Sequence, residues 1–284
     1  MIPYRDKSCP QGYNLIMNTL FFLLVVAFFL ALTLASWAVE KTKWLYLVIF
    51  FALPIAAFGY WLDTPGIAWT SMAKLATILL CAIWLWLIRF TNWFSMKTVV
   101  NVSFSLLVLN IGEVSLVDAY GGYWMNALAG LFLLFAIPSL SGIKLAPDET
   151  GTKNFTWQIP WLWIASYTLW NWTFIVNFFP QSVFTQGAVL LAPILIAAVM
   201  GREHWIKGRV HSLSLYLMMA FTWLPVFAMM DISPAAINPN TARLINAASM
   251  ILAIAAMVGR YVPQLRANHL QTSLGSRGRS KARE

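Results

Sequence analysis

The sequence predicts an all-α fold, a polytopic bundle of about nine transmembrane helices, on three observations. Apolar residues make up 60% of the 284-residue chain, and charged residues only 10%. The apolar residues fall into long stretches that short polar gaps separate. Nearly all Lys and Arg residues lie in alternate gaps. This balance excludes an ordinary soluble globular domain.

The individual spans follow from length, because a helix needs roughly 20 apolar residues to cross a hydrocarbon core of about 30 Å. The first stretch is too long for a secretory signal, and no small-residue cleavage site follows it, so we expect a retained helix. The predicted spans, in chain order, are Asn14–Val39, Trp44–Leu62, Ile67–Phe90, Thr98–Val117, Tyr123–Leu140, Ile159–Phe179, Val183–Met200, Ser212–Met230 and Thr241–Val262.

The gaps between the spans contain turn residues, such as Gly121-Gly122 and the segment Asp63 to Gly66. The longest internal gap, Gly142 to Gln158, is too short for a soluble domain. We therefore predict a single transmembrane domain over residues 1–265. A basic tail over residues 266–284 follows, and its polar composition predicts disorder in the cytoplasm.

The orientation follows from the Lys and Arg residues, of which fifteen fall on one side of the membrane and three on the other, with Lys74 inside a span. Loops rich in Lys and Arg stay in the cytoplasm, so the amino terminus is predicted outside and the carboxyl terminus inside. Arg5 and Lys7 argue in the opposite direction, and a miscounted helix would place the amino terminus inside. The apolar spans and the distribution of Lys and Arg together predict a multi-pass protein of a cell inner membrane.

The net charge of +9 is explained by the same topology signal. We therefore predict that the protein does not bind nucleic acid. The predicted partners are membrane lipids and a small-molecule substrate, and the oligomeric state is left open. The loop residues Glu203, His204 and His211 lack the spacing of a metal site, and no phosphate-binding Gly-rich loop or zinc-protease motif occurs. The prediction is therefore no cofactor and no metal, and no catalytic residue is assigned.

Two ionisable residues inside the spans are expected to contact each other. Lys74 and Glu113 each lie about 10 Å from the outer end of two sequence-adjacent, antiparallel spans. A charge at the centre of a membrane helix costs at least about 2.5–3.5 kcal/mol, and an ion pair lowers that cost. Asn110, three residues before Glu113, shares its helical face, whereas Asp118 is expected near the surface and solvated.

Further polar side chains gather in the same leaflet. Tyr167 and Asn171 share one face of the sixth predicted span, and Asn246 lies near the outer end of the ninth. The sequence therefore predicts an outward-facing polar pocket, although plain helix packing also accounts for the aromatic and amide residues. The predicted substrate-binding residues are Lys74, Asn110, Glu113, Tyr167, Asn171 and Asn246.

Two short segments carry a resemblance to a known family. The stretch Tyr167-Thr168-Leu169-Trp170-Asn171-Trp172 and the stretch Asn110-Ile111-Gly112-Glu113 are similar to an uncharacterised family of bacterial multi-pass membrane proteins, a domain of unknown function. The resemblance implies a membrane location over most of the chain and implies no activity.

Three functions are compatible with these features. The first is a carrier or binding protein for a small solute, with Glu113 as the group that senses protons or cations. The second is a membrane-embedded enzyme that acts on a lipid or lipid-linked substrate at the outer leaflet, with Glu113 as general base and Lys74 stabilising negative charge. The third is a scaffold without a ligand.

Overall fold

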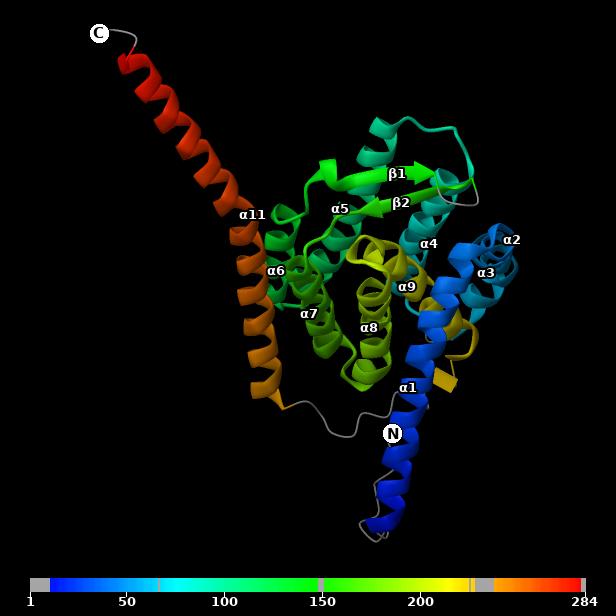
Figure 1. Ribbon diagram of the computed structural model, residues 1–284. Coiled ribbons are helices and arrows are strands. Elements are labelled where there is room, and N and C mark those ends of the chain that lie inside the picture. Colours follow the sequence, from blue (N-terminus) through cyan, green and yellow to red (C-terminus); the bar gives the residue numbers. More distant parts are fainter. Residues whose placement is uncertain (1–10, 66, 148–150, 225, 228–237, 282–284) are drawn as a thin grey trace.

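The computed structural model describes residues 11–65, 67–147, 151–224, 226–227 and 238–281. It is a bundle of helices with a small β-hairpin across one end (Figure 1). The strands are β1 (Ile143–Pro147) and β2 (Lys153–Trp157). The α-helices are α1 (Gln11–Lys41), α2 (Lys43–Leu47), α3 (Leu53–Asp63), α4 (Trp69–Phe90), α5 (Met96–Tyr120), α6 (Trp124–Phe135), α7 (Trp161–Phe178), α8 (Val183–Met200), α9 (Trp205–Thr222) and α11 (Pro239–Lys281).

Every predicted span corresponds to helical structure, but several bounds differ. A π-helical segment, Val48–Ala52, joins α2 to α3. It ends two residues before Pro54, which lacks the N–H that an α-helix would use there. Helix α6 ends at Phe135, five residues before the predicted limit, because the residue before Pro138 disfavours the α conformation. The predicted end at Met230 lies outside the described residues.

Helix α9 begins at Trp205, seven residues before the predicted start. Gly201 ends α8 with a φ of +108°, which glycine adopts without steric cost, and the chain then reverses into α9. This shift moves Lys207, Arg209 and His211 from a predicted loop into the first turns of a helix, where all three side chains are buried. The predicted spans leave all three residues in a gap between helices, and that prediction is wrong.

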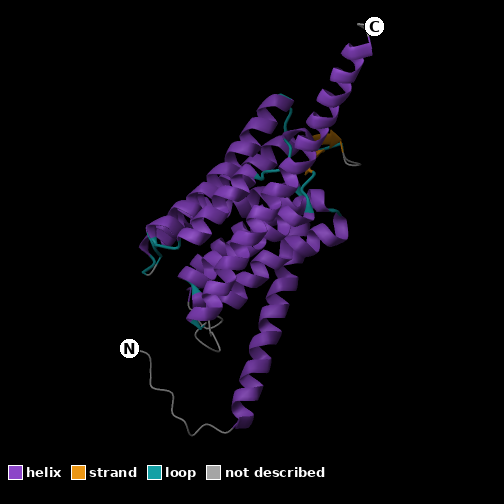
Figure 2. Ribbon diagram, turned by 90° about the vertical axis from the view of Figure 1, so that its left-hand side faces the viewer, coloured by secondary structure: helices purple, strands orange, loops and turns teal. Residues whose placement is uncertain are grey.

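The all-α prediction was wrong for the gap between α6 and α7. Strands β1 and β2 pair antiparallel there, with Ile143 opposite Trp157 and Leu145 opposite Phe155. Phe155 and Trp157 are buried and alternate with more exposed neighbours, as the two-residue period of a strand requires. The hairpin therefore covers one end of the bundle, the same end from which the later part of α11 extends (Figures 1 and 2).

The central helices are α4, α5, α7, α8 and α9, with α1 and α11 along opposite edges (Figure 1). Helix α9 contacts α1, α4 and α8, and α11 contacts α6 and α7. Helix α5 begins after Ser95, whose hydroxyl accepts a hydrogen bond from the backbone N–H of Thr98 at 3.2 Å and so caps the helix. Helix α11 takes in most of residues 266–284, and the predicted division into domain and tail stays a prediction.

The surface is apolar, as expected of an integral membrane protein. Within the described residues, six helices are long and apolar enough to cross a membrane, and α6, α7 and α9 are shorter or less apolar. Tryptophans at helix ends or in the segments between helices are strongly exposed: Trp44 by 72%, Trp69 by 80%, Trp93 by 75% and Trp124 by 64%. Such residues form the aromatic belts at the two membrane–water interfaces.

Candidate functional site

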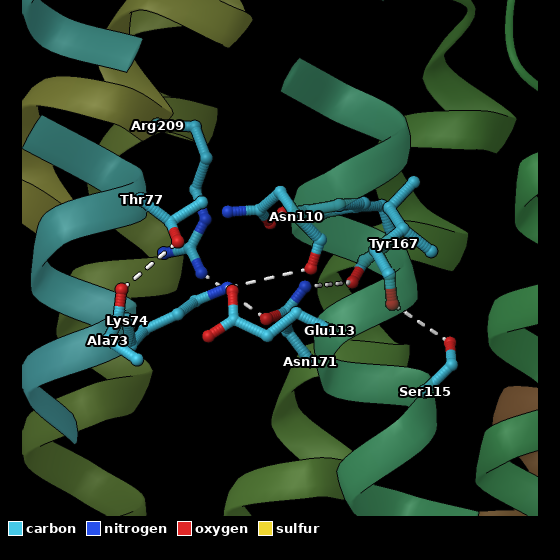
Figure 3. A network of polar contacts seen from close by, with 10 residues as sticks. Ala73, Lys74, Thr77, Asn110, Glu113, Ser115, Tyr167, Asn171 and Arg209 are labelled. Atoms are coloured by element: carbon cyan, nitrogen blue, oxygen red, sulfur yellow. Dashed lines mark hydrogen bonds and ion pairs between the residues drawn. The ribbon is translucent and has the colours of Figure 1, made fainter. Parts of the chain in front are cut away.

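Lys74 of α4 and Glu113 of α5 form the predicted ion pair. The Lys74 Nζ lies 3.2 Å from the Glu113 Oε2 and also donates a hydrogen bond of 3.5 Å to the carbonyl oxygen of Asn110. The two charged side chains are 19% and 25% exposed, so both are mostly withdrawn from the surface. The expected contact is therefore confirmed (Figure 3).

Amide and phenol groups continue this network from α5 to α7. The Tyr167 hydroxyl donates to the Asn110 Oδ1 at 3.0 Å, and the Asn171 Nδ2 donates to the Tyr167 carbonyl at 3.3 Å. Trp163 stacks on the ring of Tyr167 with a centroid distance of 5.2 Å, which fixes the ring. Five of the six predicted site residues thus lie together, and Figure 3 shows their polar ends converging.

Arg209 of α9 joins this group and was missed by the sequence analysis. Its Nη2 donates to the Asn171 Oδ1 at 3.3 Å, and its guanidinium lies 5.9 Å from the centre of the Tyr167 ring. The side chain is 6% exposed. The sequence carries no direct signal for it, because Arg209 is two residues from Lys207 and from His211 and so does not share their helical face. We call Lys74, Asn110, Glu113, Tyr167, Asn171 and Arg209 the central cluster.

Asn246, the sixth predicted residue, lies in a different polar group. It exchanges two side-chain hydrogen bonds with Asn177, at 3.0 and 3.3 Å. Nearby, Ser249 donates to Asn126, which donates in turn to the Asp118 Oδ2 at 2.8 Å. Asp118 is fully buried, so the prediction of a solvated residue near the surface was wrong. This group joins α5, α6, α7 and α11 by hydrogen bonds between side chains.

A cavity of about 50 Å³ lies beside the central cluster. Asn110, Tyr167 and Arg209 line one part of it, and Cys81, Ser103 and Trp157 line the remainder together with aliphatic side chains. The sequence predicts an outward-facing pocket, on the side away from the gaps rich in Lys and Arg. The cavity instead extends from Asn110 and Tyr167 toward the hairpin, where β2 contributes Phe155 and Trp157 to its lining. The hairpin carries Lys144 and Lys153, so this is the side of the gaps rich in Lys and Arg.

The donors and acceptors of the central cluster are ammonium, guanidinium, phenol and amide groups with one carboxylate. Such groups hydrogen-bond organic solutes or anions. No group of three His, Cys, Asp or Glu side chains that could hold a metal ion occurs in the part of the chain that the structure describes.

The comparison with known proteins places the chain in a family. The model of DUF5692, a family of unknown function, matches residues 113–273, which is 161 of the 284 residues. The chain belongs to the DUF5692 family. The matched region contains Glu113, Tyr167, Asn171 and Arg209, whereas Lys74 and Asn110 precede it. No curated protein and no solved structure matches the chain.

This DUF5692 protein has a second buried charged group, at the hairpin end, which the sequence analysis also missed. The Glu40 Oε1 lies 2.5 Å from the Lys207 Nζ and 3.4 Å from the Arg89 Nη1. Lys207 also donates to the Asn154 Oδ1 of β2 at 2.7 Å. Lys153, one residue earlier, donates to the carbonyl of Thr91 at 3.1 Å. Polar contacts therefore fasten the hairpin to α9 and to the segment after α4.

His211 extends the polar contacts from α9 into α2. Its Nε2 lies 3.0 Å from the Tyr46 hydroxyl, which donates to the carbonyl of Ala82 at 2.8 Å. The ring of His211 also stacks on Phe50. Because His211 is 1% exposed and contacts Tyr46 and Phe50, it joins α9 to α2 and the π-helical segment and is not part of a loop.

Proposed function

We propose that this DUF5692 protein is a carrier for a small solute, and that the central cluster binds the solute. The single observation that supports this proposal most is the position of the cluster. Three charged side chains from α4, α5 and α9 lie near one another inside the bundle, and one of them, Arg209, lines a cavity. Charged groups are costly in the membrane interior, and where they occur they commonly mark solute or ion pathways.

The alternatives are less well supported by the lining of the cavity. A lipid-modifying enzyme needs a site that opens laterally between helices toward lipid. The polar and aromatic lining residues, among them Ser103, Asn110, Trp157, Tyr167 and Arg209, are all less than 10% exposed, so they do not face the surface that lipid would cover. A scaffold needs neither a cavity nor unpaired polar groups beside one.

The hairpin would act as the gate at its end of the carrier. Phe155 and Trp157 cover the cavity there, and the contacts of Lys207 with Asn154 and of Lys153 with Thr91 hold the hairpin down. A solute can leave toward this side only if these contacts break. Nearer the end of the bundle opposite the hairpin, the side-chain hydrogen bonds between Asn177 and Asn246 would hold α7 and α11 together in the same way.

We further propose nine spans in a bacterial inner membrane, with the amino terminus outside and the hairpin end in the cytoplasm. Lys207 and Arg209 are buried in α9 and no longer count as loop residues, but thirteen basic residues still oppose three. Alkaline phosphatase, which is active only outside the cytoplasm, is expected to be active when fused after Pro65 and inactive when fused after Glu284. An active fusion at Glu149 contradicts this orientation.

Transport itself is tested in proteoliposomes with a panel of labelled solutes. We expect counterflow of one class of solute, abolished in Glu113→Gln and retained in Asp63→Asn, a matched control at an exposed carboxylate. The lipids of the same vesicles are extracted and analysed by mass. A chemically changed lipid without flux would establish the enzyme, and neither flux nor a changed lipid would leave the scaffold.

A further inference from the structure

We infer that the solute of this site is a small monocarboxylate with an apolar tail and that Arg209 binds its carboxylate. This inference rests on the proposed function and names the class of substrate. It depends on three features of the central cluster: its excess of positive charge, the free hydrogen-bond donors of Arg209, and the size and composition of the cavity wall.

The charges of the central cluster do not balance. Lys74 and Arg209 each contribute one positive charge, and the carboxylate of Glu113 contributes one negative charge that is already paired with Lys74. Arg209 takes part in none of the ion pairs formed among the described residues. Its charge is close enough to that of Lys74 for the two to repel each other. A bound anion would neutralise the excess charge.

The guanidinium of Arg209 also has unused donors. Its Nη2 bonds to Asn171, but Nε and Nη1 are buried and have no hydrogen-bond partner within the ranges that the structure covers. A buried donor without a partner costs about 1–3 kcal/mol, and more when it is charged. A planar carboxylate can accept one hydrogen bond from a free nitrogen and a second from the remaining N–H of Nη2. This two-point geometry is the one that arginine forms best with carboxylates.

The cavity limits the size and polarity of the remainder of the ligand. Its volume of about 50 Å³ corresponds to the space of roughly four water molecules, at about 10–15 Å³ each. Beyond Arg209, Asn110 and Tyr167, most of the wall is apolar, with Trp84, Leu107 and Trp157 among its residues. A carboxylate with a short hydrocarbon tail fits this wall, whereas a sugar or an amino acid would leave polar groups without partners.

Binding is tested first on the wild-type protein in lipid nanodiscs with three probes of nearly equal shape: butyrate, butyramide and butylamine. We expect butyrate to raise the thermal unfolding midpoint in a saturable manner and to change the fluorescence of the cavity tryptophans. Butyramide and butylamine are expected to require at least about 10-fold higher concentrations, because they lack the charge-assisted hydrogen bonds. Equal or tighter binding of either probe, or of chloride or phosphate, overturns the carboxylate assignment.

Arg209 is tested by substitution. Arg209→Met is expected to weaken butyrate binding about 10- to 100-fold, and Arg209→Lys to weaken it less, because lysine keeps the charge but not the planar geometry. The matched control is Arg202→Met, at an exposed arginine outside the cavity, with unchanged binding. Unchanged binding in Arg209→Met overturns the inference. If that variant does not fold, the probe series on the wild-type protein still tests the carboxylate assignment, and unchanged binding in Arg209→Lys overturns the role of Arg209.

The two proposals can fail separately. Counterflow of a neutral or cationic solute that depends on Glu113, together with no butyrate binding, leaves the carrier in place and overturns the carboxylate inference. Saturable butyrate binding without flux of any solute supports the anion site and overturns the carrier. Absence of both binding and flux overturns both.

Discussion

Removal of either partner of the Lys74–Glu113 pair is expected to destabilise the fold, and by unequal amounts. At 3.2 Å and an effective dielectric constant of about 20, the attraction between the charges is about 5 kcal/mol. Part of this attraction offsets the cost of withdrawing both groups from water, so we expect about 3 kcal/mol for Glu113→Gln. That variant leaves the positive charges of Lys74 and Arg209, which repel each other, without the carboxylate of Glu113.

Lys74→Met is expected to cost less than Glu113→Gln, because the nearby positive charge of Arg209 still compensates Glu113. The double variant should recover part of the summed loss, with a coupling energy of about 1–3 kcal/mol. Reversible unfolding in mixed micelles, followed by circular dichroism, measures all three variants. Lys97→Met and Asp63→Asn are controls at exposed positions. Strictly additive losses, or a larger loss for Lys74→Met, would refute the reasoning.

Two further predictions concern packing and the hairpin end. Gly130→Ala is expected to destabilise by about 1–3 kcal/mol, because its Cβ would lie 2.0 Å from the Ser115 hydroxyl, whereas Gly112→Ala, with no atom within 4 Å, should unfold like the wild type. Thermal unfolding compares the two, and equal midpoints would contradict the packing described. Glu40→Gln is expected to lower the free energy of unfolding by about 3 kcal/mol, because Lys207 keeps its hydrogen bond to Asn154 but loses the carboxylate of Glu40 as its ion-pair partner. A midpoint unchanged from wild type would contradict this.

The sequence was sufficient to predict the features that depend on hydropathy and on the depth of a residue in the membrane. The Lys74–Glu113 contact could be predicted because the two residues lie at equal depth on helices that are adjacent in sequence. Depth does not determine the direction in which a side chain points around the bundle. For this reason Asn246 was assigned to the same pocket, although its partner is Asn177.

The missed charged residues share one physical cause, which is long-range pairing of charged or polar groups. Arg209 and Lys207 resemble loop residues until their partners Asn171 and Glu40 are known, and those partners lie 38 and 167 residues away. The hairpin was missed because five-residue strands in a polar gap carry little periodic signal. The cavity extends toward the hairpin because β2 supplies two of its lining residues, Phe155 and Trp157.

The most direct measurement of the carrier proposal uses Cys81, a free, buried cysteine that lines the cavity. Replacing Cys9 with serine leaves Cys81 as the one cysteine of the chain. A carrier must expose its cavity to each side in turn. A small, membrane-impermeant thiol reagent is therefore expected to label Cys81 from either face of sealed, oriented vesicles, and transported solute should change the two rates in opposite directions. The control Cys81→Ser gives no labelling. Reaction from one face only, or from neither, would contradict the carrier.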